Sequence, residues 1–267
     1  MANLPLSRSG KTCRDVAIEA AERAGEILLR DFSSEKEVSQ KSQGNLVTGT
    51  DILVEKSTIE FLKEEYPDLQ ILSEESASSS AVSGYTWIID PLDGTNNYVF
   101  GVPFFCVNVA LVNDEDVLLG VTYDPLRREL FVAEKGQGAF LNGSAIQVSR
   151  ESSLRKSLVG LDLGYSQEQG EELLQVANAL WWQVHCLRLV GSASLGLAYV
   201  ACGRFNLYIH RYLYPWDIAS GLSLISEAGG KVLDWEGKPA GLFCREIIAG
   251  NENLCREFIS RYSGSAR

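Results

Sequence analysis

The stretch of sequence that decides the fold reads Trp87-Ile88-Ile89-Asp90-Pro91-Leu92-Asp93-Gly94-Thr95-Asn96-Asn97-Tyr98. Its first three residues are bulky and mostly β-branched, which favours a short strand buried on both faces. Pro91 is expected to end that strand because it lacks an amide donor and restricts the residue before it, so Asp90 lies at the strand's end. Asp93, Gly94 and Thr95 then predict a turn into a helix start, where Asp and Thr are favoured caps.

This stretch brings two carboxylates and a helix N-terminus close together in the sequence. Paired carboxylates suit Mg²⁺, which prefers oxygen ligands, and the free amides at a helix N-terminus suit an anion. The stretch therefore predicts a metal-bridged phosphate. From the spacing alone, the alternative is a capped turn with two solvated acids.

The composition is that of a packed globular protein, because 267 residues with 45% apolar content suffice for one large or two medium domains. A formal charge of -11 argues against nucleic acid and against an anionic membrane as partners. The six cysteines are scattered without a CxxC pair, which indicates reduced thiols. Residues 1–11 have no apolar core and no run approaches a transmembrane length, so we expect a cytoplasmic protein without a signal peptide.

Before the deciding stretch, the pattern predicts two helices. Apolar residues recur at helical spacing over residues 13–32, and Thr50 and Asp51 open a second helix that ends before Pro67. The residues expected to face the core from the second helix are Ile52, Ile59, Leu62 and Tyr66. The other elements expected here are a polar loop at 33–49, a strand at 70–73 and a mobile loop at 76–84.

After the deciding stretch, four strands with short connections predict an antiparallel meander, at 104–112, 117–123, 129–134 and 139–148. Beyond a polar segment at 149–157, strands alternate with helices, which indicates an α/β half. These strands are expected near 158–162, 186–189, 205–209, 231–233 and 246–249, and the helices near 168–182, 192–203, 216–228 and 251–261. We therefore expect an N-terminal α+β domain over residues 1–148 and a C-terminal α/β domain over residues 149–267.

Five acidic residues fall at the ends of expected strands or the starts of expected helices: Asp51, Glu74, Asp90, Asp93 and Asp217. Any one of them can be explained as a helix cap or a solvated side chain. All five at such ends favour one shared site, because loops held by a rigid scaffold carry function.

Four segments resemble the inositol monophosphatase family, in the family's order and spacing, over about residues 13–260. They are Gly44-Asn45-Leu46-Val47-Thr48-Gly49-Thr50-Asp51, Ser73-Glu74-Glu75-Ser76, Asp90-Pro91-Leu92-Asp93-Gly94-Thr95-Asn96-Asn97-Tyr98 and Trp216-Asp217-Ile218-Ala219-Ser220-Gly221. The resemblance implies a layered α-β-α-β-α sandwich of the sugar-phosphatase type, with metals at the junction of its domains. It also implies Mg²⁺-dependent hydrolysis of a small phosphate monoester, and a homodimer.

The resemblance further implies that two Mg²⁺ ions share the site. Glu74, Asp90 and the Leu92 carbonyl would hold one ion. Asp90, Asp93 and Asp217 would hold the second, so that Asp90 bridges the two. A third, weaker ion near Glu74 occurs in the family. Two ions can generate hydroxide from water and neutralise the leaving oxygen, so no protein nucleophile is required.

The other roles also follow from the resemblance. Asp51 and Thr95 would orient the attacking water, and Glu74 joins them as the third catalytic residue. The amides of Gly94 and Thr95 would hold phosphate oxygens, and Lys41 would support the metal loop electrostatically. The remaining residues implied to contact substrate are Gly191, Ser192, Ala193 and Asp217.

One position departs from the family's pattern. Inositol-specific members carry a glutamate about seven residues before the Trp-Asp motif, and this chain has His210 followed by Arg211. As substrate contacts, both residues would tolerate a phosphorylated sugar, because Arg pairs well with a second phosphate. The alternative is that both side chains point away from the pocket and serve a domain or subunit contact.

The sequence leaves the substrate open. The leading candidate is myo-inositol 1-phosphate, and the enzyme alternatives are fructose 1,6-bisphosphate and 3'-phosphoadenosine 5'-phosphate. A hypothesis of another class is a metal-binding regulatory protein that kept the fold and lost catalysis. The intact set of acids argues against it, because a site released from catalysis need not retain every ligand.

Overall fold

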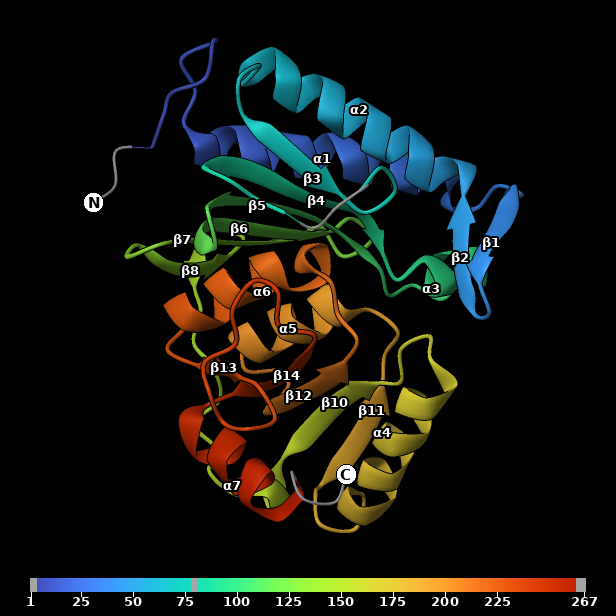
Figure 1. Ribbon diagram of the computed structural model, residues 1–267, viewed down its shortest axis with the longest axis vertical. Helices are drawn as coiled ribbons and strands as arrows, with labels where there is room; N and C mark the ends of the chain where they lie inside the picture. The colour runs from blue at the N-terminus through green and yellow to red at the C-terminus, as the bar shows by residue number, and fades with distance from the viewer. Residues whose placement is uncertain (1–3, 78–80, 263–267) are drawn as a thin grey trace.

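The computed structural model describes residues 4–77 and 81–262, and in them helices and strands stack in five layers (Figure 1). Two helices cover the outer face of a seven-stranded sheet, two lie between this sheet and a five-stranded sheet, and two cover the far face. In that order they are α1 (Cys13–Phe32) and α2 (Gly49–Glu65), α5 (Ala193–Ala201) and α6 (Pro215–Glu227), and α4 (Gln167–Leu180) and α7 (Glu252–Tyr262). The predicted α-β-α-β-α sandwich is confirmed.

The seven-stranded sheet has the order β3-β4-β5-β6-β7-β8-β9. Its strands are β3 (Gln70–Ser73), β4 (Tyr85–Asp93), β5 (Cys106–Asn113), β6 (Asp116–Asp124), β7 (Glu129–Glu134), β8 (Gly138–Leu141) and β9 (Ser144–Ala145). Strands β3 and β4 run parallel, and every later pair is antiparallel, as the meander prediction requires. Strand β5, the third in this order, is almost wholly buried, because α1 packs on one face of it and α6 on the other.

The five-stranded sheet has the order β11-β10-β12-β14-β13. Its strands are β10 (Leu158–Asp162), β11 (Cys186–Leu189), β12 (Leu207–Arg211), β13 (Lys231–Leu233) and β14 (Glu246–Gly250). Strand β10 is parallel to both of its neighbours, so the C-terminal ends of β10 and β12 lie next to each other, with Asp162 opposite His210. Residues near Asp162 and His210 are thereby brought together.

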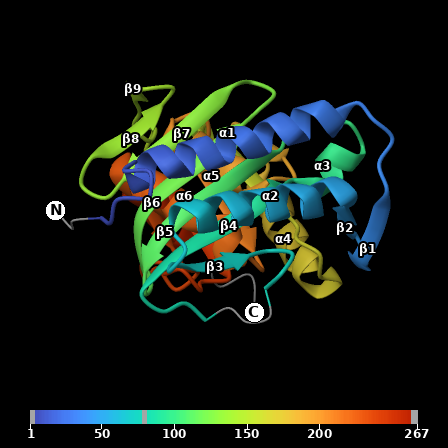
Figure 2. The ribbon, with the colours of Figure 1, turned by 90° about the horizontal axis from the view of Figure 1, so that it is seen from above.

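Helices α1 and α2 lie side by side across the large sheet (Figure 2). Small residues on α1 allow this close packing: Ala17, Ala20, Ala21 and Ala24 are all buried. The contact with the sheet is closest at Gly25, where a Cβ would come within 2.6 Å of the Tyr123 ring. The close packing of this layer therefore depends on small side chains at these positions.

Three expectations about local structure are wrong. The stretch 33–49 contains a hairpin, β1 (Val38–Ser42) and β2 (Asn45–Thr48), whose first strand is exposed throughout and so shows no apolar alternation. Ile52 is 57% exposed and does not face the core. Strand β4 does not end at Pro91, because a register shift between Asp90 and Asp93 accommodates the proline within the strand.

Three further features concern the loop at 76–84, the division into domains and the membrane. The expected mobile loop at 76–84 includes residues 78–80, which lie outside the described ranges. Between β9 and β10 the chain forms only a short 3-10 turn, η1 (Leu154–Lys156), and the division into domains at 148/149 stays a prediction. Among the helices described, none combines the length and apolar character needed to span a bilayer.

Candidate active site

The irregular end of β4 places two acids at one edge of the large sheet. The register shift turns the backbone after Asp90, and the Asp90 carboxylate accepts a hydrogen bond from the Leu92 amide at 3.0 Å. Gly94 follows with φ +94°, and a Cβ there would lie 3.0 Å from the Phe104 carbonyl oxygen, so glycine is required. The chain then enters α3 (Thr95–Val99).

A third acid approaches from the other sheet's side of the molecule. Asp217 occupies the third position of α6, where its carboxylate accepts a hydrogen bond from the Tyr214 amide at 2.6 Å. Pro215 fits the first turn of this helix because no amide donor is needed there. Oxygens of Asp90, Asp93 and Asp217 all lie within 4.8 Å of one another. The structure thus brings together acids that are separated by more than a hundred residues.

Glu74 lies just beyond β3 and is held by a cation. The Lys41 ammonium, on the β1–β2 hairpin, is 2.9 Å from a Glu74 oxygen and 2.5 Å from a Glu75 oxygen. Buried Glu55 on α2 accepts hydrogen bonds from the Ser73 hydroxyl and from the Glu75 amide, the latter at 2.8 Å. This glutamate was not predicted as part of the site, and no motif signals it.

The starts of α2 and α3 meet behind the acids. Asp51 is fully buried, and its carboxylate accepts hydrogen bonds from the amide and hydroxyl of Thr48 in a capping box. The Thr95 hydroxyl lies 3.1 Å from the other Asp51 oxygen and 3.0 Å from the Leu92 carbonyl oxygen. Burial raises the pKa of Asp51.

A pocket of about 430 Å³ opens over these groups. The predicted site residues that line it are Lys41, Glu74, Asp90, Leu92, Asp93, Gly94, Thr95, Gly191, Ser192, Ala193, His210 and Asp217. Asp51 lies one layer behind the pocket, where it contacts Thr95. The lining residues that sequence reasoning missed are Asn45, Asn96, Asp162, Leu163, Gly164, Tyr165, Tyr212, Leu213, Tyr214 and Trp216.

Asp162 anchors the pocket-lining segment that follows β11. One carboxylate oxygen accepts hydrogen bonds from the amides of Val190 and Gly191 at 2.8 and 2.6 Å, and the other accepts from the Tyr208 hydroxyl at 2.7 Å. Burial raises the pKa of Asp162 to about 6. Its place at the end of an expected strand was the one signal that could have pointed to it.

Asp93 is tied to the first turn of α5. Its carboxylate accepts hydrogen bonds from the Ser192 hydroxyl at 2.5 Å and from the Ser194 amide at 2.8 Å. The Ser194 hydroxyl in turn donates to the Asp217 backbone carbonyl at 2.9 Å. These bonds link the end of β4, the start of α5 and the start of α6, so three segments that line the pocket are tied together.

His210 and Arg211, which depart from the family's pattern, point in different directions. His210 lines the pocket, whereas Arg211 is absent from its lining because successive side chains of β12 point to opposite faces. The Arg211 guanidinium forms ion pairs with Glu172 and Glu246 and lies 4.1 Å from the Trp235 ring centroid. The expectation that Arg211 contacts substrate therefore has no support in the geometry.

Negative charge accumulates at the acid cluster. Burial raises the pKa of Asp90 well above its ordinary value, with the charge of Glu74 adding to the effect. Burial raises the pKa of Glu74 to about 7, and burial together with the charge of Asp93 raises that of Asp217. A divalent cation would relieve this repulsion, and oxygen-only donors open to a pocket fit Mg²⁺. The residues present thus fit the implied metal.

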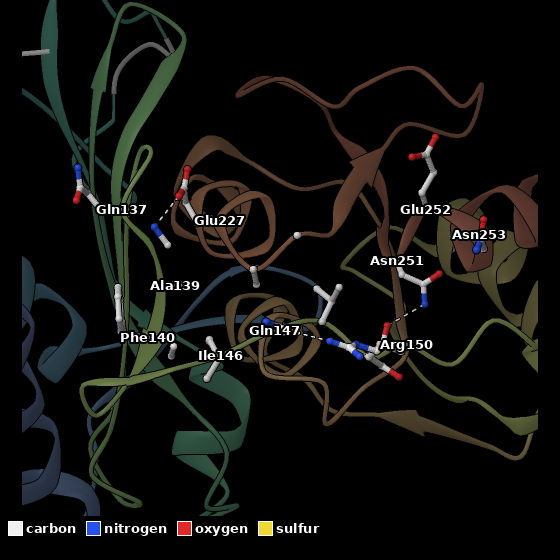
Figure 3. A pocket seen from close by; sticks show the side chains of 16 residues that line it. Gln137, Ala139, Phe140, Ile146, Gln147, Arg150, Glu227, Asn251, Glu252 and Asn253 are labelled. Carbon is white, nitrogen blue, oxygen red and sulfur yellow. Dashed lines mark hydrogen bonds between the residues drawn. The ribbon is translucent and has the colours of Figure 1, made fainter. Parts of the chain in front are cut away.

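A second pocket, of about 780 Å³, lies between β8–β9 and the start of α7 (Figure 3). Its polar groups are engaged with the protein itself: Glu227 accepts from the Gly138 amide at 2.8 Å, and Arg150 donates to Gln147 at 3.3 Å. None of the clustered acids lines it. The smaller acidic pocket is therefore the candidate active site.

Comparison with known proteins agrees with this geometry. The sequence profile described as the inositol monophosphatase family matches residues 11–264. The chain is 40% identical to inositol monophosphatase 2 of Solanum lycopersicum, over 94% of this chain and 98% of that protein. It is 38% identical to Nus factor SuhB of Xylella fastidiosa, over 90% of each chain.

Among solved structures, the Thermotoga maritima IMPase superposes with a TM-score of 0.86 at 32% identity, covering 94% of this chain and 96% of that one. The match extends over both sheets, so fold and sequence agree. The chain belongs to the inositol monophosphatase family, whose members are metal-dependent phosphoric monoester hydrolases.

Proposed function

We propose that this chain hydrolyses a small polyol phosphate monoester in a Mg²⁺-dependent reaction, with myo-inositol 1-phosphate as the leading substrate. The observation that carries the proposal is the convergence of Asp90, Asp93 and Asp217 within 4.8 Å, at a pocket that His210 also lines. The name of the Solanum lycopersicum relative supports the choice of substrate.

The carboxylates would hold the ions in two overlapping groups. Asp90, Asp93 and Asp217 would bind one Mg²⁺. Glu74, Asp90 and the Leu92 carbonyl would bind another, with Asp90 shared. When bound, the ions would supply positive charge to the phosphate and to the leaving oxygen. A third ion beside Glu74 would have to compete with the Lys41 ammonium that bridges Glu74 and Glu75.

Thr95 and Asp51 would prepare the attacking water. A threonine hydroxyl has one proton to donate, and the Asp51 carboxylate lies within reach of it. With that proton directed to Asp51, the Thr95 oxygen can accept a hydrogen bond from a water molecule and orient it. Asp51 would take up the proton, since burial raises its pKa. The amides of Gly94 and Thr95 would donate to phosphate oxygens.

His210 would recognise a hydroxyl of the substrate. Its Nδ1 lies 2.5 Å from the Arg211 carbonyl oxygen, which can only accept, so Nδ1 carries the proton. Burial lowers the pKa of His210 to about 4, so the ring is neutral and Nε2 is an acceptor. An acceptor at this place suits a polyol, as a glutamate would.

The cations available to a second phosphate are few: Lys41 in the pocket lining, and Arg245 beside the lining residue Tyr214, 4.4 Å from its ring centroid. Among the lining residues that the structure describes, Lys41 is the one Lys or Arg, and it is paired with Glu74 and Glu75. Arg211 points to the far face of β12 and is paired there. Charge complementarity therefore favours a monophosphate over fructose 1,6-bisphosphate.

Phosphate release from a panel of esters tests this proposal. The panel holds inositol 1-phosphate, fructose 1,6-bisphosphate and 3'-phosphoadenosine 5'-phosphate, each with Mg²⁺ and with a chelator. We expect the highest kcat/KM with inositol 1-phosphate and no release in chelator. Higher kcat/KM with either bisphosphate would overturn the substrate, and full activity in chelator would overturn the metal mechanism.

We also propose a cytoplasmic homodimer. The rings of Trp181 and Trp182 contact each other at a tilt of 35°, with centroids 4.3 Å apart, and both are at least half exposed, which suits a subunit surface. Light scattering on the purified protein should give twice the monomer mass. A Trp182→Ser variant is expected to shift that mass toward the monomer.

A further inference from the structure

Three buried polar side chains meet between the large sheet and α6. Asn108 on β5, Thr122 on β6 and Ser220 on α6 are all at most 2% exposed. The Thr122 hydroxyl lies 2.8 Å from the Asn108 side-chain oxygen and 2.9 Å from the Ser220 hydroxyl, which is 3.0 Å from that same Asn108 oxygen. Three oxygens thus share two hydroxyl protons in the buried layer between the large sheet and α6.

This cluster sits between the elements that carry two of the acids. Asn108 is the register partner of Asp90 across β4 and β5, and Thr122 is the partner of Asn108 across β5 and β6. Ser220 follows Asp217 by three residues and so lies on the same side of α6. The hydrogen bonds therefore join the strand next to Asp90 to the helix turn after Asp217.

Beside the cluster α6 packs closely on β6, and the other hydrogen bonds from α6 to the large sheet lie farther along the helix, at Ser223 and Glu227. A Cβ on Gly120 would come within 2.6 Å of the Ser220 carbonyl oxygen, so the backbone of α6 rests directly on β6. Close packing of this kind fixes the distance between helix and sheet. Such packing does not stop the helix from sliding along the strand, because apolar contact has no preferred direction. Directional hydrogen bonds are needed to resist that movement.

A second polar chain leads from the cluster toward the acids. The Asn108 side-chain nitrogen is 3.8 Å from the Cys106 sulfur, which lies 3.7 Å from an Asp93 carboxylate oxygen. Cys106 and Asp93 are register partners on the same strands as Asn108 and Asp90. The cluster is thus connected to the acid site through the sheet as well as through α6.

We infer that Asn108, Thr122 and Ser220 are positioning residues that hold α6 in register with the large sheet and thereby set the spacing of Asp217 from Asp90. This inference rests on the proposed metal site. Because a bridged cation requires its ligands at fixed separations, loosening the cluster would weaken Mg²⁺ binding more than it weakens the fold.

Two pairs of variants test the inference. Ser220→Ala removes one hydroxyl from the cluster, and Ser223→Ala is its control, since Ser223 is also buried on α6 but donates to the Ala133 carbonyl at 3.3 Å. Thr122→Val removes the other hydroxyl at constant volume, and Thr122→Ser keeps it. Calorimetric titration with Mg²⁺ gives the Kd, and thermal unfolding in chelator gives the stability.

We expect Ser220→Ala and Thr122→Val to raise the Mg²⁺ Kd about tenfold, the lower end of the range for residues that hold metal ligands in place. Ser223→Ala and Thr122→Ser should keep the parent Kd within about twofold, on the same scale. Unchanged constants in Ser220→Ala and Thr122→Val would overturn the inference and leave the metal site intact. Absence of Mg²⁺ binding in the parent would overturn both.

Discussion

The Thr95 hydroxyl lies 3.1 Å from a carboxylate oxygen of Asp51, and the two residues begin different helices that are far apart in the sequence. Asp51 is held on its other side by Thr48, so it cannot turn away from Thr95. A buried carboxylate with one fixed partner and one hydroxyl partner is well suited to receive a proton through that hydroxyl.

Thr95→Ala is therefore expected to lower kcat by roughly a hundredfold or more, with a much smaller change in KM, because orienting the water matters mainly in the transition state. Steady-state kinetics with inositol 1-phosphate at saturating Mg²⁺ measure both constants. Thr86→Ala is the matched control, since Thr86 is also buried but lies four residues before Asp90 on β4. An effect confined to KM would make Thr95 a substrate-binding residue instead.

Asp90→Asn should have opposite effects on function and on stability. It removes the shared charge of the acid cluster, so Mg²⁺ binding and activity are expected to be lost. It also removes repulsion with Glu74 and Asp93, so the protein in chelator should unfold at a higher temperature than the parent. Thermal unfolding with and without Mg²⁺ measures both effects. A lower unfolding temperature in chelator would show that Asp90 serves the fold.

The repulsion within the acid cluster should also make the stability of the protein depend on pH. Glu74, with a pKa raised to about 7 mainly by burial, keeps its proton in the fold at pH values where the unfolded chain has lost it. Its contribution to stability is complete below pH 4.5, the ordinary value, and is lost as the pH rises through about 7. His210 acts in the opposite sense, because burial lowers its pKa from 6.5 to about 4. Its contribution to stability is complete above pH 6.5 and is lost as the pH falls toward 4.

Between about pH 6.5 and 8, the parent in chelator is thus expected to unfold at progressively lower temperature, since Glu74 still loses its proton there and His210 no longer contributes. Added Mg²⁺ should stabilise the protein most at the upper end of this range. In Glu74→Gln the slope in chelator should be shallower. A rising unfolding temperature across the range would contradict the electrostatic account of the cluster.

The acids could be predicted because each ends or begins an element that the local pattern specifies. Asp90 follows three buried residues and Asp217 opens an amphipathic helix, so both were predictable without knowing which strand pairs with which. The break in β4 was misjudged, since Pro91 is tolerated only because the pairing with β5 shifts at that point. Such a shift is a property of two strands, and one strand's sequence does not contain it.

Asp162 and Ser194 could not be predicted, because their roles depend on contacts across the fold. Asp162 reaches Gly191 through the parallel pairing of β10 with β11, and Ser194 reaches Asp217 through the packing of α5 on α6. The prediction that Ile52 faces the core was wrong for a different reason. It has the apolar character of a core residue, yet it lies on the face of α2 that no layer covers.

The last prediction concerns His210. If neutral Nε2 accepts a hydrogen bond from a substrate hydroxyl, His210→Leu should lower kcat/KM for inositol 1-phosphate by up to about tenfold, the worth of one such bond, mainly by raising KM. His210→Gln offers an amide oxygen as acceptor and should restore part of the loss. The rate with p-nitrophenyl phosphate, which has no hydroxyl, should be unchanged in both variants. Arg211→Ala breaks the ion pairs with Glu172 and Glu246, so it should lower the unfolding temperature without altering the ratio of the two substrates. Equal losses with both substrates in His210→Leu would show that this histidine shapes the pocket and does not read the polyol.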